Sequence, residues 1–143
     1  MATTLYTAEA LSTGGGRDGH VRTADGALDV DMTMPKELGG AGRGVNPELL
    51  FAAGYAACFH SALQGVARAR RVSITGSSVG ARVSLQRQGE EGPDFGLAVH
   101  LEVAVPELPV DLVRELADAA HAACPYSKAT RGNIELTVDV VQD

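Results

Sequence analysis

The sequence predicts an α+β fold with largely antiparallel sheets, and three observations support it. Several segments alternate apolar and polar residues with the period of two expected for a half-buried strand. Two other segments have the length and apolar content of helices. The elements follow the order βββαββαβ, and strands grouped in runs are typical of α+β folds. The length of 143 residues suits one domain, so we expect a single domain over residues 1–143.

The first third of the chain predicts three strands. Thr3–Ser12 forms the first and ends at the glycine-rich run Thr13–Gly19, because clustered glycines interrupt strands. His20–Thr23 follows as a short return strand, and Ala24–Gly26 predicts a hairpin turn of the Asp-Gly type. Leu28–Met34 alternates apolar and polar residues, which predicts the third strand.

The glycine-rich segment Pro35–Val45 lies between a strand and a helix, where phosphate-binding loops also occur. It lacks the Lys-Ser/Thr pair of a P-loop, and its glycine spacing does not fit the dinucleotide fingerprint. We interpret it as a connector rather than a nucleotide site.

A central helix is predicted from Asn46 to about Arg70. Asn46 suits the N-cap, Pro47 the first helical position and Glu48 the first turn. Leu49–Leu63 carries no charged side chain, whereas a surface helix would show a polar face. We therefore expect this helix to be enclosed on most sides, and we expect a two-fold homodimer to supply part of the cover.

The remaining elements are two strands, a helix and a strand. Val79–Leu85 and Phe95–Val105 alternate as strands. Val110–Ala123 has a helical apolar stripe, and Pro125 ends the helix. Ile134–Val140 predicts the last strand.

Composition limits the functional classes. The net charge of −6 argues against a nucleic-acid surface, which needs clustered Lys and Arg. The N-terminus shows neither the basic leader nor the apolar run of a secretory signal. The central helix approaches membrane-spanning length, but it is rich in Ala and Gly and contains His60 and Gln64. We expect a cytoplasmic protein without a membrane partner.

Cys58 and Cys124 are the only thiols, and both are expected on inward-facing helix positions. Buried cysteines often act only as small hydrophobes, and that reading stays open beside the alternative of a reactive pair. A reactive thiolate needs a nearby cation or a helix N-terminus to lower its pKa. Cys58 lies too far along its own helix for the helix dipole to act, so any activating cation must come from elsewhere.

Metal and hydrolase chemistry are less well supported. Cys58, His60, His121 and Cys124 form a nominal Cys2His2 set, but Cys-x-His within one helix is the wrong spacing for finger-type zinc ligation. We expect no metal. A Cys–His hydrolase would lack a recognisable nucleophile signature.

Three motifs resemble one known family. They are NPELLFAAGYAACF around Cys58, CPYSKATRGNIEL around Cys124 and LYTAEALSTGGGRDGHV near the N-terminus. Together they resemble the organic hydroperoxide resistance (Ohr) branch of the Ohr/OsmC family, from the first strand to the last. Val45, Leu49 and Lys128 depart from residues common in the family, but none removes a catalytic group.

This resemblance implies a thiol-dependent peroxidase that reduces organic hydroperoxides, including fatty-acid hydroperoxides, as an antioxidant in the stress response. Cys58 matches the peroxidatic cysteine, and Cys124 matches the resolving cysteine with which it would form a disulfide. Arg17 matches the catalytic arginine and Glu48 its carboxylate partner. The resemblance also implies an OsmC-like intertwined homodimer around long central helices. No bound cofactor is implied; recycling would use an external dithiol, dihydrolipoamide or a lipoylated protein.

Phe51, Phe59 and Leu63 are candidate walls of an apolar substrate pocket, with Gly39–Gly44 as a candidate lid.

Glu48 and Cys58 are ten positions apart, which is about 15 Å of axial rise in a continuous helix. Glu48 should therefore serve the Cys58 of a partner subunit, in a composite site.

Two alternatives remain at this point. One is an OsmC-type peroxidase of different substrate range, although Arg17 in its glycine turn favours the Ohr branch. The other is a non-enzymatic protein that binds hydroperoxides or lipids and whose cysteines are passive.

Overall fold

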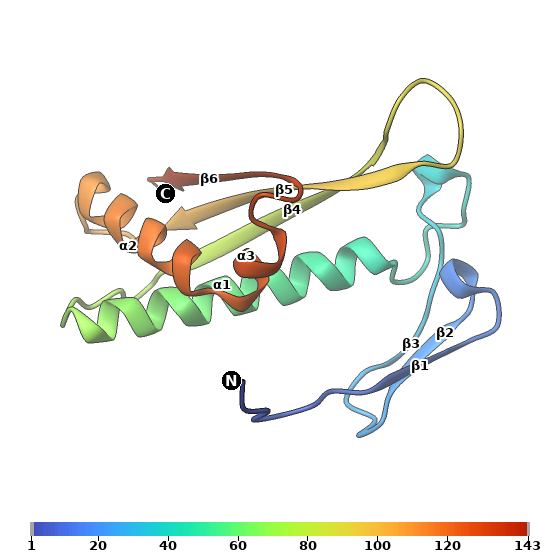
Figure 1. The fold of residues 1–143 in the computed structure, drawn as a ribbon, viewed down its shortest axis with the longest axis horizontal. Coiled ribbons are helices and arrows are strands. Elements are labelled where there is room, and N and C mark those ends of the chain that lie inside the picture. The colour runs from blue at the N-terminus through green and yellow to red at the C-terminus, as the bar shows by residue number, and fades with distance from the viewer. Residues whose placement is uncertain (1, 143) are drawn as a thin grey trace. The chain divides into compact units, whose positions relative to one another are not determined.

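The computed structural model describes residues 2–142, and the chain forms two compact units, one up to Leu50 and one from Phe51 onward. Figure 1 follows the chain through both units. Each unit contains one three-stranded sheet, and helices accompany the second sheet. The predicted α+β class and its largely antiparallel sheets are confirmed.

The first unit is an antiparallel meander in the order β1-β2-β3. Its strands are β1 (Ala10–Thr13), β2 (His20–Thr23) and β3 (Asp29–Asp31). A short 3₁₀ turn, Gly16–Asp18, joins β1 to β2, and another, Lys36–Leu38, follows β3.

The first and third strands differ most from the sequence prediction, while the limits of β4, β5 and β6 differ from it by one or two residues. The first strand begins at Ala10 rather than Thr3, because Ala10 pairs with Thr23, where β2 ends, so earlier residues find no partner on β2. The third strand stops at Asp31, since the next residue, Met32, forms an isolated bridge with Val45. A strand needs a partner along its whole length, and alternation alone does not supply one.

The second sheet has the order β4-β5-β6. The elements are α1 (Pro47–Ala69), β4 (Ser78–Arg87), β5 (Phe95–Ala104), α2 (Val110–Ala123), α3 (Pro125–Thr130) and β6 (Glu135–Val141). Strands β4 and β5 are antiparallel, whereas β5 and β6 are parallel. The parallel pair follows from the chain crossing through α2 and α3 between β5 and β6.

Helix α1 begins as predicted. The Asn46 side-chain oxygen accepts a hydrogen bond from the Leu49 N–H at 2.8 Å, which is the N-cap interaction. The predicted end at about Arg70 is one residue past the observed end at Ala69.

Helix α3 is absent from the predicted order. Pro125 does end α2, but proline also suits the first position of a helix, and a new six-residue helix starts there. Cys124 stands between the two helices in an extended conformation, with φ −63° and ψ 124°.

The core of the second unit lies on one face of its sheet. Val99, Leu101 and Val103 alternate along β5 and are buried. Helices α1 and α2 pack on this face (Figure 1). Their buried stripes repeat every three or four residues and consist of Tyr55, Phe59, Leu63 and Ala67 on α1, and Val113, Leu116, Ala117 and Ala120 on α2.

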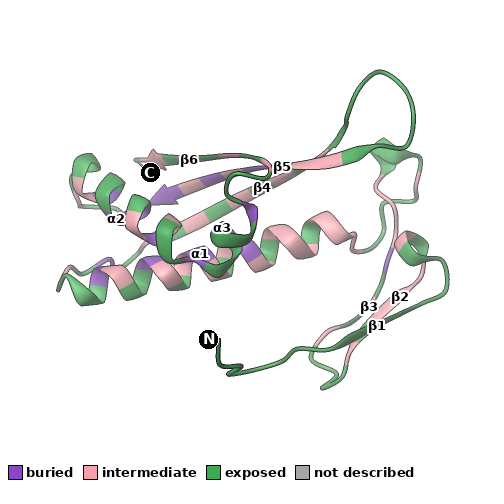
Figure 2. Ribbon diagram, in the orientation of Figure 1, coloured by how far each residue is buried: buried purple, intermediate pink, exposed green. Residues whose placement is uncertain are grey.

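Within one chain, α1 buries a single stripe, and Figure 2 shows half-buried and exposed residues on its other faces. Ala53, Ala57, Ser61 and Gly65 are exposed on the uncovered side. The expectation of a helix enclosed on most sides is therefore not met by this chain alone. The same helix is long and apolar enough to cross a membrane, but the core helix of a soluble protein can meet the same criterion.

Candidate functional site

Two of the predicted site residues, an arginine and a glutamate, pair within the first unit. Arg17 lies in the 3₁₀ turn between β1 and β2, and Glu48 lies in the first turn of α1. Arg17 Nη1 donates to Glu48 Oε1 at 2.6 Å, and Nη2 donates to Oε2 at 3.2 Å. This two-point contact orients the guanidinium plane, and its hydrogen bonds raise the pKa of Arg17 further, so the cation is permanent.

Glycine shapes the turn that carries Arg17. A Cβ at Gly19 would stand 2.1 Å from the Thr13 carbonyl oxygen and 2.8 Å from the Gly15 nitrogen. Only glycine permits this close approach of backbone to backbone.

The two predicted cysteines lie together within the second unit. Cys58 lies near the middle of α1, and Cys124 lies at the junction of α2 and α3. Both are free thiols, and their Sγ atoms are 3.5 Å apart. A disulfide requires about 2.05 Å, so a small movement would join the two sulfur atoms. Cys124 is fully buried, while Cys58 is half-buried.

The surroundings of Cys58 in this unit favour the protonated thiol. Burial raises the pKa of Cys58, a hydrogen bond from the Tyr126 backbone N–H lowers it, and Cys124 raises it, with a net increase. The thiolate, not the thiol, is the nucleophilic form of a cysteine. The residues of the second unit therefore favour the thiol form of Cys58 over the thiolate, and a nearby cation would act in the opposite direction.

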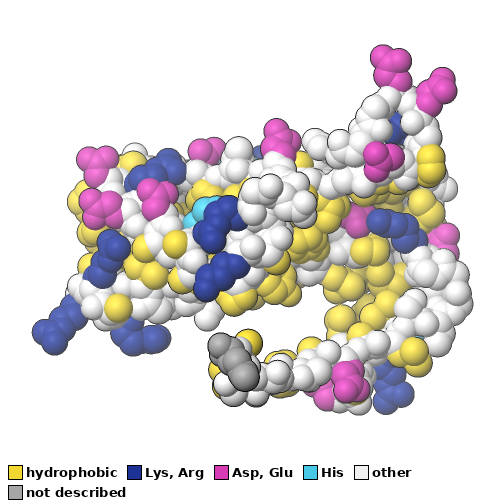
Figure 3. Space-filling view, viewed as in Figure 1, with side chains coloured by type: hydrophobic (Ala, Val, Ile, Leu, Met, Phe, Trp, Pro, Cys, Tyr) yellow, Lys and Arg dark blue, Asp and Glu magenta, His cyan; other side chains and the backbone are white. Residues whose placement is uncertain are grey.

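A shallow groove of about 540 Å³ opens beside Cys58. It follows α1 from Cys58 to Ala69 and is closed on the other side by Ala123 and Pro125. Figure 3 shows hydrophobic side chains along α1 and basic side chains at its C-terminal end. The groove is lined mostly by small and apolar residues, which suits an alkyl group better than a strongly hydrated molecule.

The three predicted pocket residues lie in different surroundings. Phe59 and Leu63 are fully buried in the core. Phe51 is half-buried and belongs to an aromatic cluster, with ring centroids 6.0 Å from Tyr55 and 6.1 Å from Tyr126. The groove beside Cys58 is lined by other residues, and the role of these three as pocket walls stays a prediction.

The two histidines near the cysteines make hydrogen bonds to serines. His60 Nε2 lies 2.9 Å from Ser77 Oγ, and His121 Nδ1 lies 2.9 Å from Ser127 Oγ. Among residues 2–142, no three His, Cys, Asp or Glu side chains are grouped so that they could hold a metal ion.

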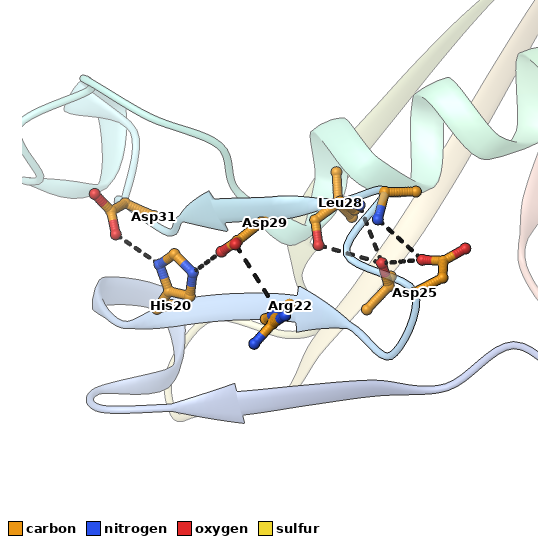
Figure 4. A network of polar contacts seen from close by, with 8 residues as sticks. His20, Arg22, Asp25, Leu28, Asp29 and Asp31 are labelled. Carbon is orange, nitrogen blue, oxygen red and sulfur yellow. Dashed lines mark hydrogen bonds and ion pairs between the residues drawn. The ribbon is translucent and has the colours of Figure 1, made fainter.

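A third histidine stabilises the hairpin that follows Arg17. His20 of β2 lies between two carboxylates of β3, with Nδ1 2.8 Å from Asp31 and Nε2 in contact with Asp29 (Figure 4). Carboxylates only accept hydrogen bonds, so the two contacts can form together only when both ring nitrogens carry a proton, as in the imidazolium. The hydrogen bonds to Asp31 and then to Asp29 raise the pKa of His20, in agreement with this geometry.

A group of buried hydroxyls lies beside the cysteines and was not predicted from the sequence. The Tyr55 hydroxyl on α1 lies within hydrogen-bond distance of Ser127 and Thr130, both on α3. Ser127 and Thr130 share a face only because α3 is a helix, and α3 was not predicted. Pro125 as a helix start was the signal that could have revealed them.

Comparison with known proteins covers nearly the whole chain. The family model described as "OsmC-like protein" matches residues 39–139. An organic hydroperoxide resistance protein of Xanthomonas axonopodis pv. citri is 47% identical over 136 residues, covering 94% of this chain and 93% of that protein. The organic hydroperoxide resistance protein OhrB of Bacillus subtilis is 43% identical over 136 residues, covering 95% and 98%.

Solved structures agree with these matches. An organic hydroperoxide resistance protein from Elizabethkingia anophelis has a TM-score of 0.91 at 43% identity and covers 99% of this chain and 100% of that chain. A structure described as organic hydroperoxide resistance protein OsmC, from Legionella pneumophila, has a TM-score of 0.90 at 46% identity, covering 96% and 98%.

Proposed function

Because the chain belongs to the OsmC-like family and, within it, to the organic hydroperoxide resistance proteins, we propose that it is a thiol-dependent peroxidase that reduces organic hydroperoxides to alcohols. The observation that carries this proposal is the 3.5 Å separation of the Cys58 and Cys124 sulfur atoms. Two free thiols in contact beside an apolar groove are suited to reversible two-electron chemistry.

The first step is attack by the Cys58 thiolate on the distal oxygen of the hydroperoxide. The sulfur–oxygen bond forms as the oxygen–oxygen bond breaks, and the alkoxide leaves and takes up a proton as the alcohol. Cys58 becomes a sulfenic acid, so the sulfur has lost the two electrons that the peroxide gained.

The second step is attack by Cys124 on the Cys58 sulfenic acid. The disulfide forms, and the leaving hydroxide takes up a proton as water. A dithiol then reduces the disulfide by thiol–disulfide exchange. We propose a dihydrolipoyl group, free or on a lipoylated protein, as this dithiol.

Activation of Cys58 requires a cation, since burial in the second unit raises the pKa of its thiol. We assign this role to Arg17, which Glu48 already orients. In the composite site proposed from the spacing along α1, the Arg17–Glu48 pair of one subunit of a homodimer activates Cys58 of the other. A monomeric variant would then be inactive.

The preferred substrate is proposed to be an alkyl or fatty-acid hydroperoxide. The small and apolar groove beside Cys58 supports this choice, because it favours an alkyl group over the hydrated hydrogen peroxide molecule.

One experiment tests the reaction directly. The reduced protein receives one equivalent of tert-butyl hydroperoxide, peroxide loss is timed, and the thiols are mapped by mass spectrometry. We expect rapid loss together with a Cys58–Cys124 disulfide, and none of either in Cys58→Ser. Intact peroxide with both thiols free would exclude the peroxidase and favour the passive-binding alternative.

The reductant is identified by the same assay run for many turnovers. Dihydrolipoamide is expected to sustain peroxide consumption, and thioredoxin with its reductase serves as the comparison. A preference for thioredoxin would contradict the lipoyl assignment while leaving the peroxidase chemistry intact. Localisation in the cytoplasm stays a prediction that fractionation would check.

A further inference from the structure

A series of buried polar groups joins α1 to α3 beside the two cysteines. Tyr55 of α1 is fully buried, and its hydroxyl lies 2.8 Å from Ser127 Oγ and 3.0 Å from Thr130 Oγ1. Ser127 is also fully buried, and Thr130 is nearly so. Buried hydroxyls cost free energy unless they are hydrogen-bonded, so these contacts constrain how α3 sits on α1.

The series continues at both ends. His121 Nδ1 on α2 lies 2.9 Å from Ser127 Oγ. At the other end, Thr130 Oγ1 donates to the Tyr126 carbonyl oxygen at 3.0 Å. The contacts therefore run in order from His121 through three hydroxyls to a backbone carbonyl.

The backbone fixes the order of donors along this series. Thr130 Oγ1 lies 3.0 Å from the Tyr126 carbonyl oxygen and 3.4 Å from that of Ser127, and carbonyls only accept, so the single Thr130 proton goes to a backbone carbonyl. Tyr55 must then donate to Thr130, because Thr130 has no proton left. By the same reasoning Ser127 donates to Tyr55, and His121 Nδ1 donates to Ser127.

This order requires the histidine to carry a proton on Nδ1. Burial lowers the pKa of His121, nearby Arg131 lowers it further, and Asp118 raises it, with a net decrease. A neutral ring near neutral pH, protonated on Nδ1, is compatible with both its environment and its place in the series.

The series ends on the residue that meets the attacking thiol. The Tyr126 carbonyl accepts from Thr130, and the backbone N–H of the same residue acts to lower the pKa of the Cys58 thiol. At the start of the same helix, Cys124 precedes Pro125. Tyr55 lies one turn before Cys58 on α1. The hydroxyls thus connect the helix that carries Cys58 to the corner that carries Cys124.

We propose that Tyr55, Ser127 and Thr130, oriented by His121, are positioning residues for the resolving step. They hold α3 against α1 so that the Cys124 sulfur stays within reach of Cys58 after Cys58 has been oxidised. This inference rests on the proposed peroxidase function.

The chemistry makes this role measurable as a competition. The Cys58 sulfenic acid either condenses with Cys124, releasing water, or reacts with a second hydroperoxide to give sulfinic acid and alcohol. Moving Cys124 by about 1 Å slows the first route, since such misplacement can cost up to about 10²-fold in rate. The second route does not involve Cys124 and stays open.

The test measures this partition in Tyr55→Phe and Ser127→Ala. Each reduced variant is titrated with tert-butyl hydroperoxide, and the ratio of disulfide to sulfinic acid is read by mass spectrometry. We expect half of Cys58 to become sulfinic acid at about tenfold lower hydroperoxide than in the wild type. An unchanged partition in both variants would overturn the proposal.

Two controls separate positioning from general loss of stability. Val113→Ala removes buried methyl groups from α2 without touching the series, and it should keep the wild-type partition. If Val113→Ala changed the ratio of disulfide to sulfinic acid as much as Tyr55→Phe does, the proposal would be contradicted. His121→Asn retains a donor near the Nδ1 position, so its ratio of disulfide to sulfinic acid should stay close to that of the wild type. His121→Ala removes the donor, so its Cys58 should form more sulfinic acid.

A readout without peroxide distinguishes failure of this inference from failure of the proposed function. If the wild type consumes no hydroperoxide, the peroxidase proposal fails on its own. The Cys58–Cys124 equilibrium is then measured in a glutathione redox buffer. Tyr55→Phe should make the disulfide about tenfold less favourable, or about 30 mV less negative in potential. Equal potentials in the variant and the wild type would again reject the positioning role.

Discussion

The sulfur atoms of Cys58 and Cys124 lie 3.5 Å apart, although 66 positions separate the two residues along the chain. Cys58 projects from the middle of a long helix, while Cys124 occupies the extended residue between two shorter helices. Because the two sulfur atoms are this close, a small movement would join them in a disulfide, and this leads to the first prediction.

Cys124→Ser should separate attack from resolution. We expect the first equivalent of hydroperoxide to be consumed at a near wild-type rate, since Cys58 is retained. Turnover with dihydrolipoamide should fall by about 10²-fold, because the resolving thiol is no longer held at high effective concentration. Stopped-flow peroxide loss and dimedone labelling of the sulfenic acid measure the two steps. Undiminished turnover would show that the reductant attacks Cys58 directly.

Arg17→Lys should slow the proposed attack of Cys58 on the hydroperoxide, although it keeps the positive charge. Lys keeps the charge but cannot make the two-point contact with Glu48, which has distances of 2.6 and 3.2 Å. We expect the rate constant for attack to fall about tenfold or more, and Glu48→Gln to have a similar effect. Arg22→Lys is the matched control, because Arg22 is exposed and lies 3.9 Å from its carboxylate partner. Wild-type rates in both Arg17→Lys and Glu48→Gln would remove the pair from the mechanism.

The pH profile of the attack step should depend on Arg17. Burial raises the pKa of the Cys58 thiol, so the thiolate fraction grows as pH rises, and the rate should rise with it. Loss of the cation in Arg17→Gln should move this rise to higher pH. Ultraviolet absorbance of the thiolate, measured in the Cys124→Ser background, follows Cys58 alone. A profile that is the same with and without Arg17 would mean that another group activates the thiol.

The hairpin after Arg17 should weaken at alkaline pH. Both carboxylate contacts raise the folded-state pKa of His20 above its unfolded value of about 6.5. Their stabilisation is therefore fully present below that value and is lost as pH rises through the raised folded-state pKa. NMR titration of the His20 ring should show a lower pKa in Asp31→Asn. Asp25→Asn, on the same hairpin but hydrogen-bonded to Thr23 and Ala27, should leave it unchanged.

The local pattern of the sequence was sufficient for most elements. Val110–Ala123 is helical over the predicted residues, and His20–Thr23 is a strand over the predicted residues. Period and capping are properties of neighbouring residues, so they can be read without knowing the rest of the fold. The predicted limits of β1 and β3 were wrong because a strand ends where its partner strand ends. The partner is distant in sequence, so neighbouring residues do not reveal that limit.

The sequence by itself determined the two thiols, the arginine in its glycine turn and the family to which their motifs belong. Only the tertiary structure decided that the thiols touch and that Tyr55 reaches Ser127, 72 positions away. It also decided that only one row of α1 side chains, from Tyr55 to Ala67, is buried by the described residues of the same chain. Periodicity specifies which residues face a core, whereas the distances between them depend on how separate helices pack. That packing is a property of the whole chain.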